Sequence, residues 1–600
     1  MAIAVASSPG SAERLSIAEV RLQDFRSFSD CCVSLETRTL LVGENNSGKS
    51  TFLHALSLCL SGGQPREDDF RSVNGSRLPE FTIDVRVEPH GPSATFDASL
   101  TQVIGTAIQG SASDGKAYFT LRYRSRLNPG DGPTFVRTFV RGWANNRAEA
   151  ANLVELAQPH VTQKHRDLVT FTLLDARRDI VTEIRNRRSH WGRLLSDLQL
   201  PDAQRSKLES DLKTISEAVL KDSSRLTTIQ DALRAISSVI SRNDLGVHVA
   251  ALPSNVNELV RYVDLLVGEQ AQVALPVDQQ GMGTRSLLSI MLFRAFVDEV
   301  LKASAAYTLP VTAIEEPEAH VHPHVQRALL PELHKLRGQV LVSTHAPGIA
   351  AVADVFSVRL FRAGKSGSTV RQLSRQDAKR KPRLDAVGVT LLHRFIQKRN
   401  ADLFFCRVAA LYEGDTEDAA LDVFAQATLK ASASAAGVSL VNVQGAGNYK
   451  HFIPFLEDLG IPWVILSDAD GAGTEGVAAA AKALGRPLDA TSPQLVFYSS
   501  GNDFEAQIIE DGLRPQAESA IAKFYTPTAL ADHKVRLHGS KGRGAVIRDY
   551  TSTGWEDRLV HDFLDLNKGS FGSAFAEEVL AAGKAMPHVT AFFSKVMAFL

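Results

Sequence analysis

A glycine-rich segment at residues 43–51, GENNSGKST, constrains the fold more than any other part of the sequence. It fits the pattern G-x-x-x-x-G-K-[ST], in which glycines let backbone N–H groups turn inward around a phosphate. The helix that follows such a loop presents its positive end to the same anion. The flanking sequences TLLV and TFLHALSLCL suit a buried strand before the loop and a helix after it. The segment therefore predicts a nucleotide-binding α/β domain rather than a chance glycine turn.

Every residue of this loop except Glu44 has a predicted role at the nucleotide. Lys49 is predicted to reach the terminal phosphates, and the hydroxyl of Ser50 is predicted to hold Mg²⁺. The other residues predicted to contact ATP here are Gly43, Asn45, Asn46, Ser47, Gly48 and Thr51.

An acidic strand end supplies the second half of such a site. Residues 311–318 read VTAIEEPE, an apolar run that ends in carboxylates. Glu315 is predicted to organise Mg²⁺, and Glu316 is predicted to act as the general base that orients the attacking water. Two exposed acids that merely end a strand are the alternative, which the apolar run and the upstream glycine loop disfavour.

Two weaker elements extend the nucleotide site. In QGMGTRSLLS, residues 280–289, the residues Gly281, Gly283 and Ser286 precede a predicted helix and suit a loop that contacts the γ-phosphate from an opposite subunit. In STHAP, residues 343–347, His345 ends the next predicted strand and is predicted to act as a switch histidine. A lone glycine turn or histidine is more often structural, but the order and spacing here favour the functional interpretation.

Carboxylates also follow two strands in the second half of the chain. Glu413 and Glu417 lie in LYEGDTED, residues 411–418, where a strand enters a helix. Asp468 and Asp470 lie in LSDADG, residues 466–471, and their spacing of two places both side chains on one face. Oxygen-only ligands suit hard cations such as Mg²⁺ or Mn²⁺. Unrelated surface acids are the alternative.

The remaining sequence indicates how the chain is organised. Residues 1–14 read as a tail, and residues 80–88 and 117–124 alternate with period two, as antiparallel strands do. Apolar residues at heptad spacing over 205–242 predict either a helix pair folded on itself or a dimerisation arm. We therefore expect an ATPase domain over 15–395 with a helical insert at about 185–245. A second α/β domain over 400–510 and a C-terminal part over 511–600 follow.

Composition restricts the compartment and the partners. The net charge of −1 means that nucleic acid would have to bind local basic patches. These are Arg177–Arg178, Arg185–Arg193, Lys379–Arg383, Lys398–Arg399 and Arg536–Arg543. Four scattered cysteines fit a reducing, cytoplasmic compartment better than a disulfide framework, and neither a secretion signal nor a membrane span is expected.

The order of these motifs resembles known families. VRLQDFRSF…LLVGENNSGKST and EEPEAHVHP resemble the RecF/SMC/Rad50-like branch of ABC ATPases, in which two heads sandwich the nucleotide. EGDTE at 413–417, the glycine turn in VNVQGAGNYK and DAD at 468–470 resemble a Toprim domain. The two in this order resemble the overcoming-lysogenisation-defect (OLD) nucleases. The resemblance implies a homodimer or a higher even oligomer and two divalent metals at the Toprim site.

By the same resemblance, Glu417, Asp468 and Asp470 would belong to one metal, and Glu413 and Glu505 to the other. Ser467 would contact the metal shell. Lys541 would lie near the scissile phosphate and stabilise its charge, although a lysine that only contacts the DNA backbone is the alternative.

The implied function is an ATP-dependent, metal-dependent DNA endonuclease in phage defence or DNA repair. Two alternatives stay open: an SMC-like DNA clamp without nuclease activity, and a primase-like or topoisomerase-like enzyme. Some relatives are encoded beside a UvrD-like helicase, as in the Gabija subgroup, so such a helicase is a further possible partner. The sequence does not indicate whether ATP activates or inhibits cleavage.

Overall fold

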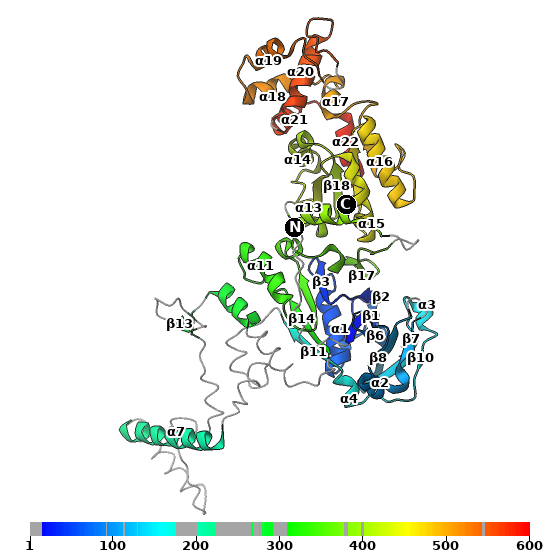
Figure 1. The fold of residues 1–600 in the computed structure, drawn as a ribbon, viewed down its shortest axis with the longest axis vertical. Coiled ribbons are helices and arrows are strands. Elements are labelled where there is room, and N and C mark those ends of the chain that lie inside the picture. The colour runs from blue at the N-terminus through cyan, green and yellow to red at the C-terminus, as the bar shows by residue number, and fades with distance from the viewer. Residues whose placement is uncertain are drawn as a thin grey trace, which may run out of the picture.

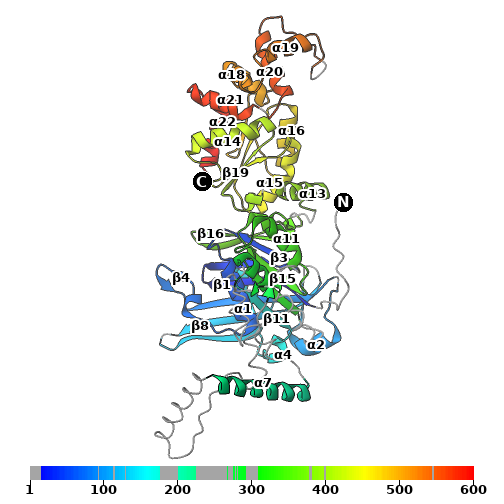
Figure 2. The same ribbon diagram turned by 90° about the vertical axis from the view of Figure 1, so that its left-hand side faces the viewer.

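The structure is a computed structural model, in which the residues described below are 15–91, 93–111, 115–128, 130–175, 201–223, 266–267, 275–276, 279, 281–291, 309–376, 382–397, 401–542, 546–569 and 571–600. The chain forms an elongated stack (Figures 1 and 2). Two sheets of the first part lie at one end, the sheet of the second part lies in the middle, and helices near the C-terminus lie at the other end.

A six-stranded sheet carries the glycine-rich loop. Its strand order is β11 (Val169–Leu174), β14 (Leu309–Glu315), β15 (Gln339–Thr344), β3 (Arg38–Gly43), β16 (Val358–Gly364) and β17 (Gly367–Arg371). The first five strands are parallel, and β17 pairs antiparallel with β16. Since parallel strands end at a common edge, the residues that follow β3, β14 and β15 are brought together there.

A second, antiparallel sheet covers helix α1 (Lys49–Ser61). Its strand order is β10 (Val154–Glu155), β9 (Gly132–Arg141), β8 (Ala117–Asn128), β6 (Glu80–Pro89), β1 (Leu15–Phe25) and β2 (Phe28–Ser34). Apolar residues of α1 and of both sheets form one core. The antiparallel pairing of β6 with β8 confirms the prediction for residues 80–88 and 117–124.

A four-stranded parallel sheet carries the second acidic site. Its order is β19 (Val438–Asn442), β18 (Val408–Tyr412), β20 (Trp463–Ser467) and β21 (Leu495–Phe497). All residues of β18 and β20 are buried, as in a sheet covered on both faces. The covering helices include α14 (Asp415–Leu429), α15 (Tyr449–Asp458) and α16 (Gly471–Leu484).

Helices complete the C-terminal part. They are α17 (Phe504–Glu510), α18 (Arg514–Phe524), α19 (Ala529–Leu537), α20 (Trp555–Leu566), α21 (Gly572–Ala581) and α22 (Pro587–Met597). Apolar residues of α17, α18 and α20–α22 share a core with β18 and α14, so this part packs against the sheet that precedes it.

Apolar packing and polar contacts join the two sheet systems. One continuous core contains residues from β3, β14 and β15 together with residues of β18, α15 and α13 (Ala386–Phe395). Arg383 contacts Asp458 of α15 at 3.0 Å, and Asp458 also accepts the backbone N–H of Ser374 at 3.0 Å. The six-stranded sheet and the four-stranded sheet are therefore joined through one core that also includes helices.

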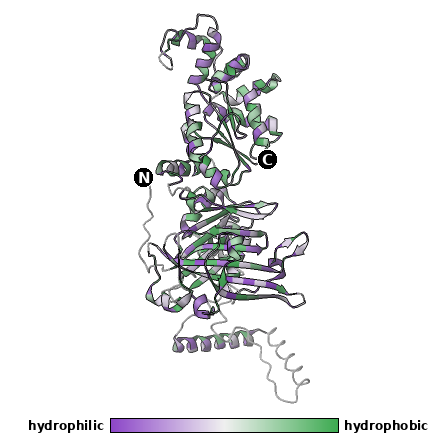
Figure 3. Cartoon of the chain, turned by 90° about the vertical axis from the view of Figure 1, so that its right-hand side faces the viewer, coloured by the Kyte–Doolittle hydropathy of each residue, from purple (hydrophilic) through white to green (hydrophobic). Residues whose placement is uncertain are grey.

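The predicted helical insert is described only in part. Helix α7 (Asp202–Asp222) lies beyond the sheets and carries both apolar and polar residues (Figure 3). Leu208, Ile215 and Val219 of its heptad seam are exposed. Residues 224–265, which contain the rest of the seam, lie outside the described residues. A helix pair and a dimerisation arm therefore both stay open.

The other described elements are peripheral to the sites. They are β4 (Ser72–Val73), β5 (Ser76–Arg77), β7 (Gln109–Gly110), β12 (Leu266–Val267), β13 (Leu275–Pro276), α2 (Ala98–Ile104), α3 (Arg147–Ala150), α4 (Gln163–Arg166), α11 (Pro323–Leu333) and α12 (Pro347–Ala350). Over the described part of the chain, every helix is too short or too polar to cross a bilayer.

Candidate functional site

The glycine-rich loop has the geometry of a phosphate cradle. Gly43 and Gly48 have φ angles of 157° and 107°, and a Cβ at Gly43 would lie 2.3 Å from the carbonyl oxygen of Phe361. Lys49 is buried and donates to the carbonyl oxygens of Gly43 at 2.7 Å and Glu44 at 2.9 Å. Its ammonium is thus folded back over the loop, where an anion would meet it.

Acidic residues face this lysine from the end of β14. Burial lowers the pKa of Lys49, while the charges of Glu316, Glu318 and Glu315 oppose that shift. Glu316 has a φ of 42°, and its backbone N–H donates to Ser343 of β15 at 2.9 Å. The predicted Mg²⁺ acid and the predicted general base therefore lie at the same sheet edge as the loop.

The predicted switch histidine also lies at this edge. His345 follows β15, and its Nδ1 lies 3.4 Å from Glu316 Oε1 and 3.6 Å from Glu318 Oε1. The sequence singled out Glu316 and His345, but it gave Glu318 no role. The EEPE run was the available signal for Glu318, although only packing places this carboxylate against the end of β15.

The glycines predicted to meet a second subunit's nucleotide begin a helix. Residues 282–291 are helical, and a Cβ at Gly283 would lie 2.7 Å from the carbonyl oxygen of His320. Ser286 is buried, whereas Met282 is exposed. This segment therefore packs against the residues that follow β14, which is where the other nucleotide-site residues lie.

Glu413 connects two strand ends at the second site. Its Oε1 accepts the hydroxyl of Ser467 at 2.5 Å and the backbone N–H of Asp468 at 3.1 Å, and its Oε2 accepts the N–H of Ala446 at 3.1 Å. Burial raises the pKa of Glu413 despite these hydrogen bonds. The carboxylate thus bridges β18 and β20 at the carboxyl edge of the sheet.

Two further predicted ligands are buried beside Glu413. Desolvation, together with the charges of neighbouring carboxylates, raises the pKa of Asp468 to about 8 and raises that of Glu417 well above its usual value. Glu417 accepts hydrogen bonds from Gly414 N at 2.6 Å and from the Tyr498 hydroxyl at 3.1 Å. Asp468 Oδ1 is buried with no hydrogen-bond partner among the described residues. This crowding of carboxylates calls for a cation.

Asp470 has a local structural role as well. Its side chain caps α16 by accepting the N–H of Gly473 at 2.8 Å. This cap holds the turn between Asp468 and the helix.

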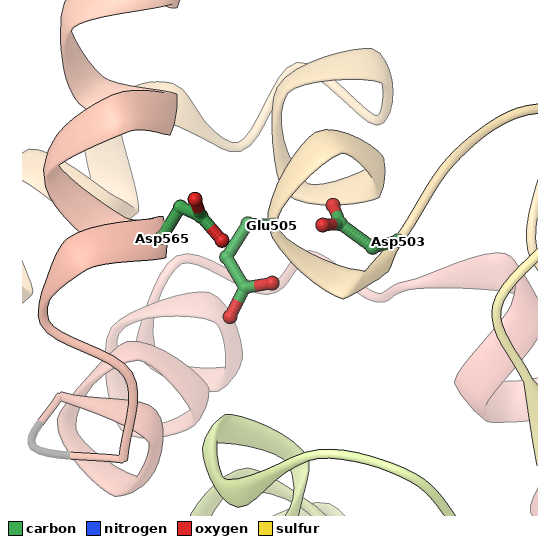
Figure 4. Close-up of side chains that lie close together, drawn as sticks. All are labelled: Asp503, Glu505 and Asp565. Carbon is green, nitrogen blue, oxygen red and sulfur yellow. The ribbon is translucent and has the colours of Figure 1, made fainter. Parts of the chain in front are cut away.

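Three more carboxylates lie close together in the C-terminal part (Figure 4). Carboxylate oxygens of Asp503, Glu505 and Asp565 all lie within 4.8 Å of one another, the first two from the start of α17 and the third from α20. The ammonium of Lys568 lies 3.1 Å from Glu505, 3.2 Å from Asp565 and 3.9 Å from Asp503. Glu505 also accepts the hydroxyl of Thr416 at 2.7 Å, which ties the group to α14.

The charges of this group are compensated. Although burial opposes ionisation of Asp503, a hydrogen bond from His561, the N–H of Ala506 and the charge of Lys568 lower its pKa to about 2. Desolvation lowers the pKa of Lys568, but the charges and hydrogen bonds of Glu505, Asp503 and Asp565 together outweigh it, so the pKa rises overall. The sequence could not place Asp565 and Lys568 beside Glu505, because only the packing of α17 against α20 brings them there. Asp503 lies two residues before Glu505, so its position in the sequence was the available signal for it.

Lys541 lies on another segment of the chain. It is exposed and forms a β-bridge with Ile547 in the segment between α19 and α20. Of the predicted basic patches, Arg177–Arg178, Arg185–Arg193 and Lys398–Arg399 lie outside the described residues, and Lys379–Arg383 and Arg536–Arg543 are described only in part. The described contacts do not join Lys541 to the carboxylates.

The donor sets fit the groups that the sequence implies. At the first site, backbone N–H groups, Lys49 and a buried Ser47 hydroxyl without a described partner suit a nucleotide phosphate. At the second, oxygen ligands and the unpartnered Asp468 Oδ1 suit a hard divalent cation. A bound metal would also offset the repulsion that raises the carboxylate pKa values.

Two family models match the chain. Residues 38–351 match "AAA domain, putative AbiEii toxin, Type IV TA system". Residues 404–470 match "Overcoming lysogenization defect protein-like, TOPRIM domain". The two matches fall on the parts that contain the nucleotide-site residues and the Glu413 site.

Two relatives match long stretches of the chain. An "OLD nuclease" of Thermus scotoductus is 25% identical over 474 residues, which cover 75% of this chain and 81% of the relative. The "Retron Ec83 probable ATPase" of Escherichia coli is 22% identical over 394 residues, which cover 59% of this chain and 72% of the relative.

Among solved structures, an Smc head domain from Pyrococcus furiosus, bound to the C-terminal domain of ScpA, is 13% identical with a TM-score of 0.34. The match covers 60% of this chain and 96% of that one.

Proposed function

Because this chain belongs to the AAA-domain family described as "putative AbiEii toxin, Type IV TA system" and carries an OLD-like Toprim domain, we propose that it is an ATP-regulated DNA endonuclease that uses divalent metals. The predicted α/β ATPase domain, the Toprim domain and the helices that follow it are confirmed. So is the prediction of an enzyme with ATPase and nuclease domains. DNA as the substrate, the identity of the metals and the role of each residue are proposals.

The observation that carries this proposal is the carboxylate site at the edge of the four-stranded sheet. Glu413 links the ends of β18 and β20, and beside it Asp468 keeps a buried oxygen without a described partner. A purely structural module has no need for several converging carboxylates whose ionisation is unfavourable. A site for phosphodiester hydrolysis does need them, because metal ions activate water and stabilise the leaving oxygen.

The proposed roles at the metal site follow from these contacts. Glu417, Asp468 and Asp470 would hold one divalent ion, and Glu413 and Glu505 would hold the other. Bound Mg²⁺ or Mn²⁺ would supply Lewis-acid stabilisation of the scissile phosphate. Ser467 orients Glu413 through its hydroxyl.

The nucleotide site would provide regulation. Lys49 and the loop backbone would hold the phosphates of ATP, Ser50 and Glu315 would hold Mg²⁺, and Glu316 would orient the attacking water. Gly281, Gly283 and Ser286 would contact the nucleotide of a second subunit in a homodimer or higher even oligomer. His345, beside Glu316, would sense the γ-phosphate.

We infer a role in phage defence or DNA repair from the relatives named above. A UvrD-like helicase partner, and with it membership of the Gabija subgroup, stays a prediction. Co-purification of the chain with its genomic neighbours would test it.

Supercoiled plasmid provides the test of the main proposal. The protein is incubated with Mg²⁺ or Mn²⁺, with and without ATP, beside Glu413→Ala and Lys49→Ala. Relaxed or linear plasmid from the wild type but not from Glu413→Ala is the expected result, and Lys49→Ala then gives the sign of ATP control. Intact plasmid in every lane, with ATP still hydrolysed, would favour the DNA clamp instead.

A further inference from the structure

Glu318 is a buried carboxylate next to the nucleotide site. It is 5% exposed, and its two described hydrogen bonds use one oxygen. Oε1 accepts the hydroxyl of Thr344 at 2.7 Å and the backbone N–H of His345 at 3.0 Å. Since a buried carboxylate is costly unless it is paired or hydrogen-bonded, this position depends on the groups at the end of β15.

The hydrogen bonds form a brace around the switch histidine. The hydroxyl of Thr344, which donates to Glu318, accepts the N–H of Ala346 at 3.0 Å. The backbone on both sides of His345 is thereby fixed through one carboxylate oxygen. The connection between β15 and α12 is thus held at the last residue of β15, Thr344, and at both residues of the loop, His345 and Ala346.

The same carboxylate faces the imidazole. Nδ1 of His345 lies 3.6 Å from Glu318 Oε1 and 3.4 Å from Glu316 Oε1. Because one ring nitrogen faces both carboxylates, the other, Nε2, is turned away from them. The arrangement fixes the orientation of the ring relative to the proposed general base.

Glu318 also belongs to the phosphate side of the sheet. Its charge acts on Lys49, the lysine of the glycine-rich loop. Its second oxygen, Oε2, is buried and has no hydrogen-bond partner among the described residues. The brace is therefore part of the nucleotide site and not a remote loop anchor.

We propose that Glu318 is a positioning residue for ATP hydrolysis, which sets the backbone and the ring of His345 so that Nε2 meets the γ-phosphate while Nδ1 stays beside Glu316. The proposal rests on the ATPase part of the proposed function and is independent of DNA cleavage. It assigns Glu318 no contact with the nucleotide.

A double-mutant cycle on ATP hydrolysis tests this role. Glu318→Ala is expected to lower kcat about 100-fold, the loss typical of a misplaced catalytic group, with the affinity for a fluorescent ATP analogue unchanged. Residues that act as a unit are non-additive. Glu318→Ala combined with His345→Ala should therefore be no slower than His345→Ala alone. A double variant that loses the product of the two single effects would overturn the proposal.

Conservative variants separate positioning from a general structural role. Glu318→Gln keeps an oxygen that can accept both hydrogen bonds, so it should recover most of kcat, and a Gln variant as slow as the Ala variant would count against positioning. Thr344→Val removes the hydroxyl donor without touching the carboxylate. It replaces Glu318→Ala in the same cycle if thermal unfolding shows that the alanine variant does not fold. Plasmid cleavage, scored separately, reports failure of the nuclease proposal alone.

Discussion

At the scale of single residues, the second site is defined by carboxylates that resist ionisation together. Burial and neighbouring charges raise the pKa of Asp468 to about 8, whereas an unfolded aspartate titrates near 3.9. At Asp468 the folded, metal-free protein therefore binds more protons than the unfolded chain between these values. The contribution of this carboxyl to the free energy of unfolding must fall as the pH rises from about 4 to about 8.

Metal binding should reverse this dependence. A divalent ion has to displace the proton from Asp468, so its affinity should rise with pH and level off above about 8. We expect the increase in Tm caused by Mn²⁺ to grow from pH 6.5 to pH 8.5 in thermal unfolding. Asp468→Asn, which carries no titrating proton, serves as the control and should flatten the profile. An equal shift at every pH would contradict the prediction.

Two lysines near the second domain are predicted to differ in function. The ammonium of Lys568 offsets the negative charge of Asp503, Glu505 and Asp565, whereas Lys541 is exposed on a separate segment. Lys568→Ala should lower the rate of metal-dependent cleavage about 100-fold, as loss of one electrostatic stabiliser does. Lys541→Ala should instead weaken DNA binding and reduce the salt slope by about 1, as loss of a phosphate contact does.

Rate measurements at saturating DNA, together with binding at several salt concentrations, separate the two lysines. If Lys541→Ala abolishes cleavage at saturating DNA while Lys568→Ala does not, Lys541 has the catalytic role and the assignment is reversed.

At the scale of elements, helix α16 sets the position of the metal loop. A Cβ on Gly473 would lie 2.1 Å from the carbonyl oxygen of Asp468. Gly473→Ala must therefore displace the loop or the helix, at a cost of about 1–3 kcal/mol of overpacking. We expect weaker Mn²⁺ binding by calorimetry and slower cleavage, with ATP hydrolysis unchanged.

Gly471 provides a matched control in the same helix, because a Cβ there would meet nothing within 4 Å. Gly471→Ala should leave metal binding and stability close to those of the wild type. Equal losses in both variants would show that the close approach at Gly473 is not what positions the loop.

The elements differ in how far the sequence could predict them. The loop after β3 and the acids after β14, β18 and β20 could be found because each depends on a short segment with its own strand and helix. Asp565 and Lys568 could not, since they meet Glu505 only through the packing of α17 against α20. Glu318 was overlooked for a related reason: its partners, Thr344 and His345, belong to a different strand.

At the scale of the whole molecule, the nucleotide loop and the nuclease sheet share the walls of one cavity. This cavity of about 280 Å³ is lined by Gly43 and Glu44 of the loop on one side and by residues 404–407, just before β18, on the other. Arg362 of β16 also lines this cavity and donates to the carbonyl oxygen of Cys406 at 2.7 Å. Since β18 leads directly to Glu413, a shift of the loop on ATP binding has a short physical route to the metal site.

Arg362→Ala should therefore weaken the coupling between the two sites while each site stays intact. Burial lowers the pKa of Arg362. Its guanidinium donates a hydrogen bond to the Cys406 carbonyl oxygen, so loss of the side chain leaves that oxygen without this donor. We expect ATP hydrolysis and Mn²⁺ binding within a few-fold of wild type, and a smaller ratio of cleavage rates with and without ATP. An allosteric coupling of about 1–3 kcal/mol corresponds to a ratio of 5 to 150 in the wild type.

Arg407→Ala is the matched control, because Arg407 lines the same cavity and is exposed without a described hydrogen bond across the junction. It should keep the wild-type ratio. An Arg362→Ala variant with an unchanged ratio would show that the signal passes through another contact, of which the Arg383–Asp458 ion pair is the next to test. A variant that loses cleavage with and without ATP would show that Arg362 supports the fold of the nuclease sheet instead of transmitting the state of the nucleotide.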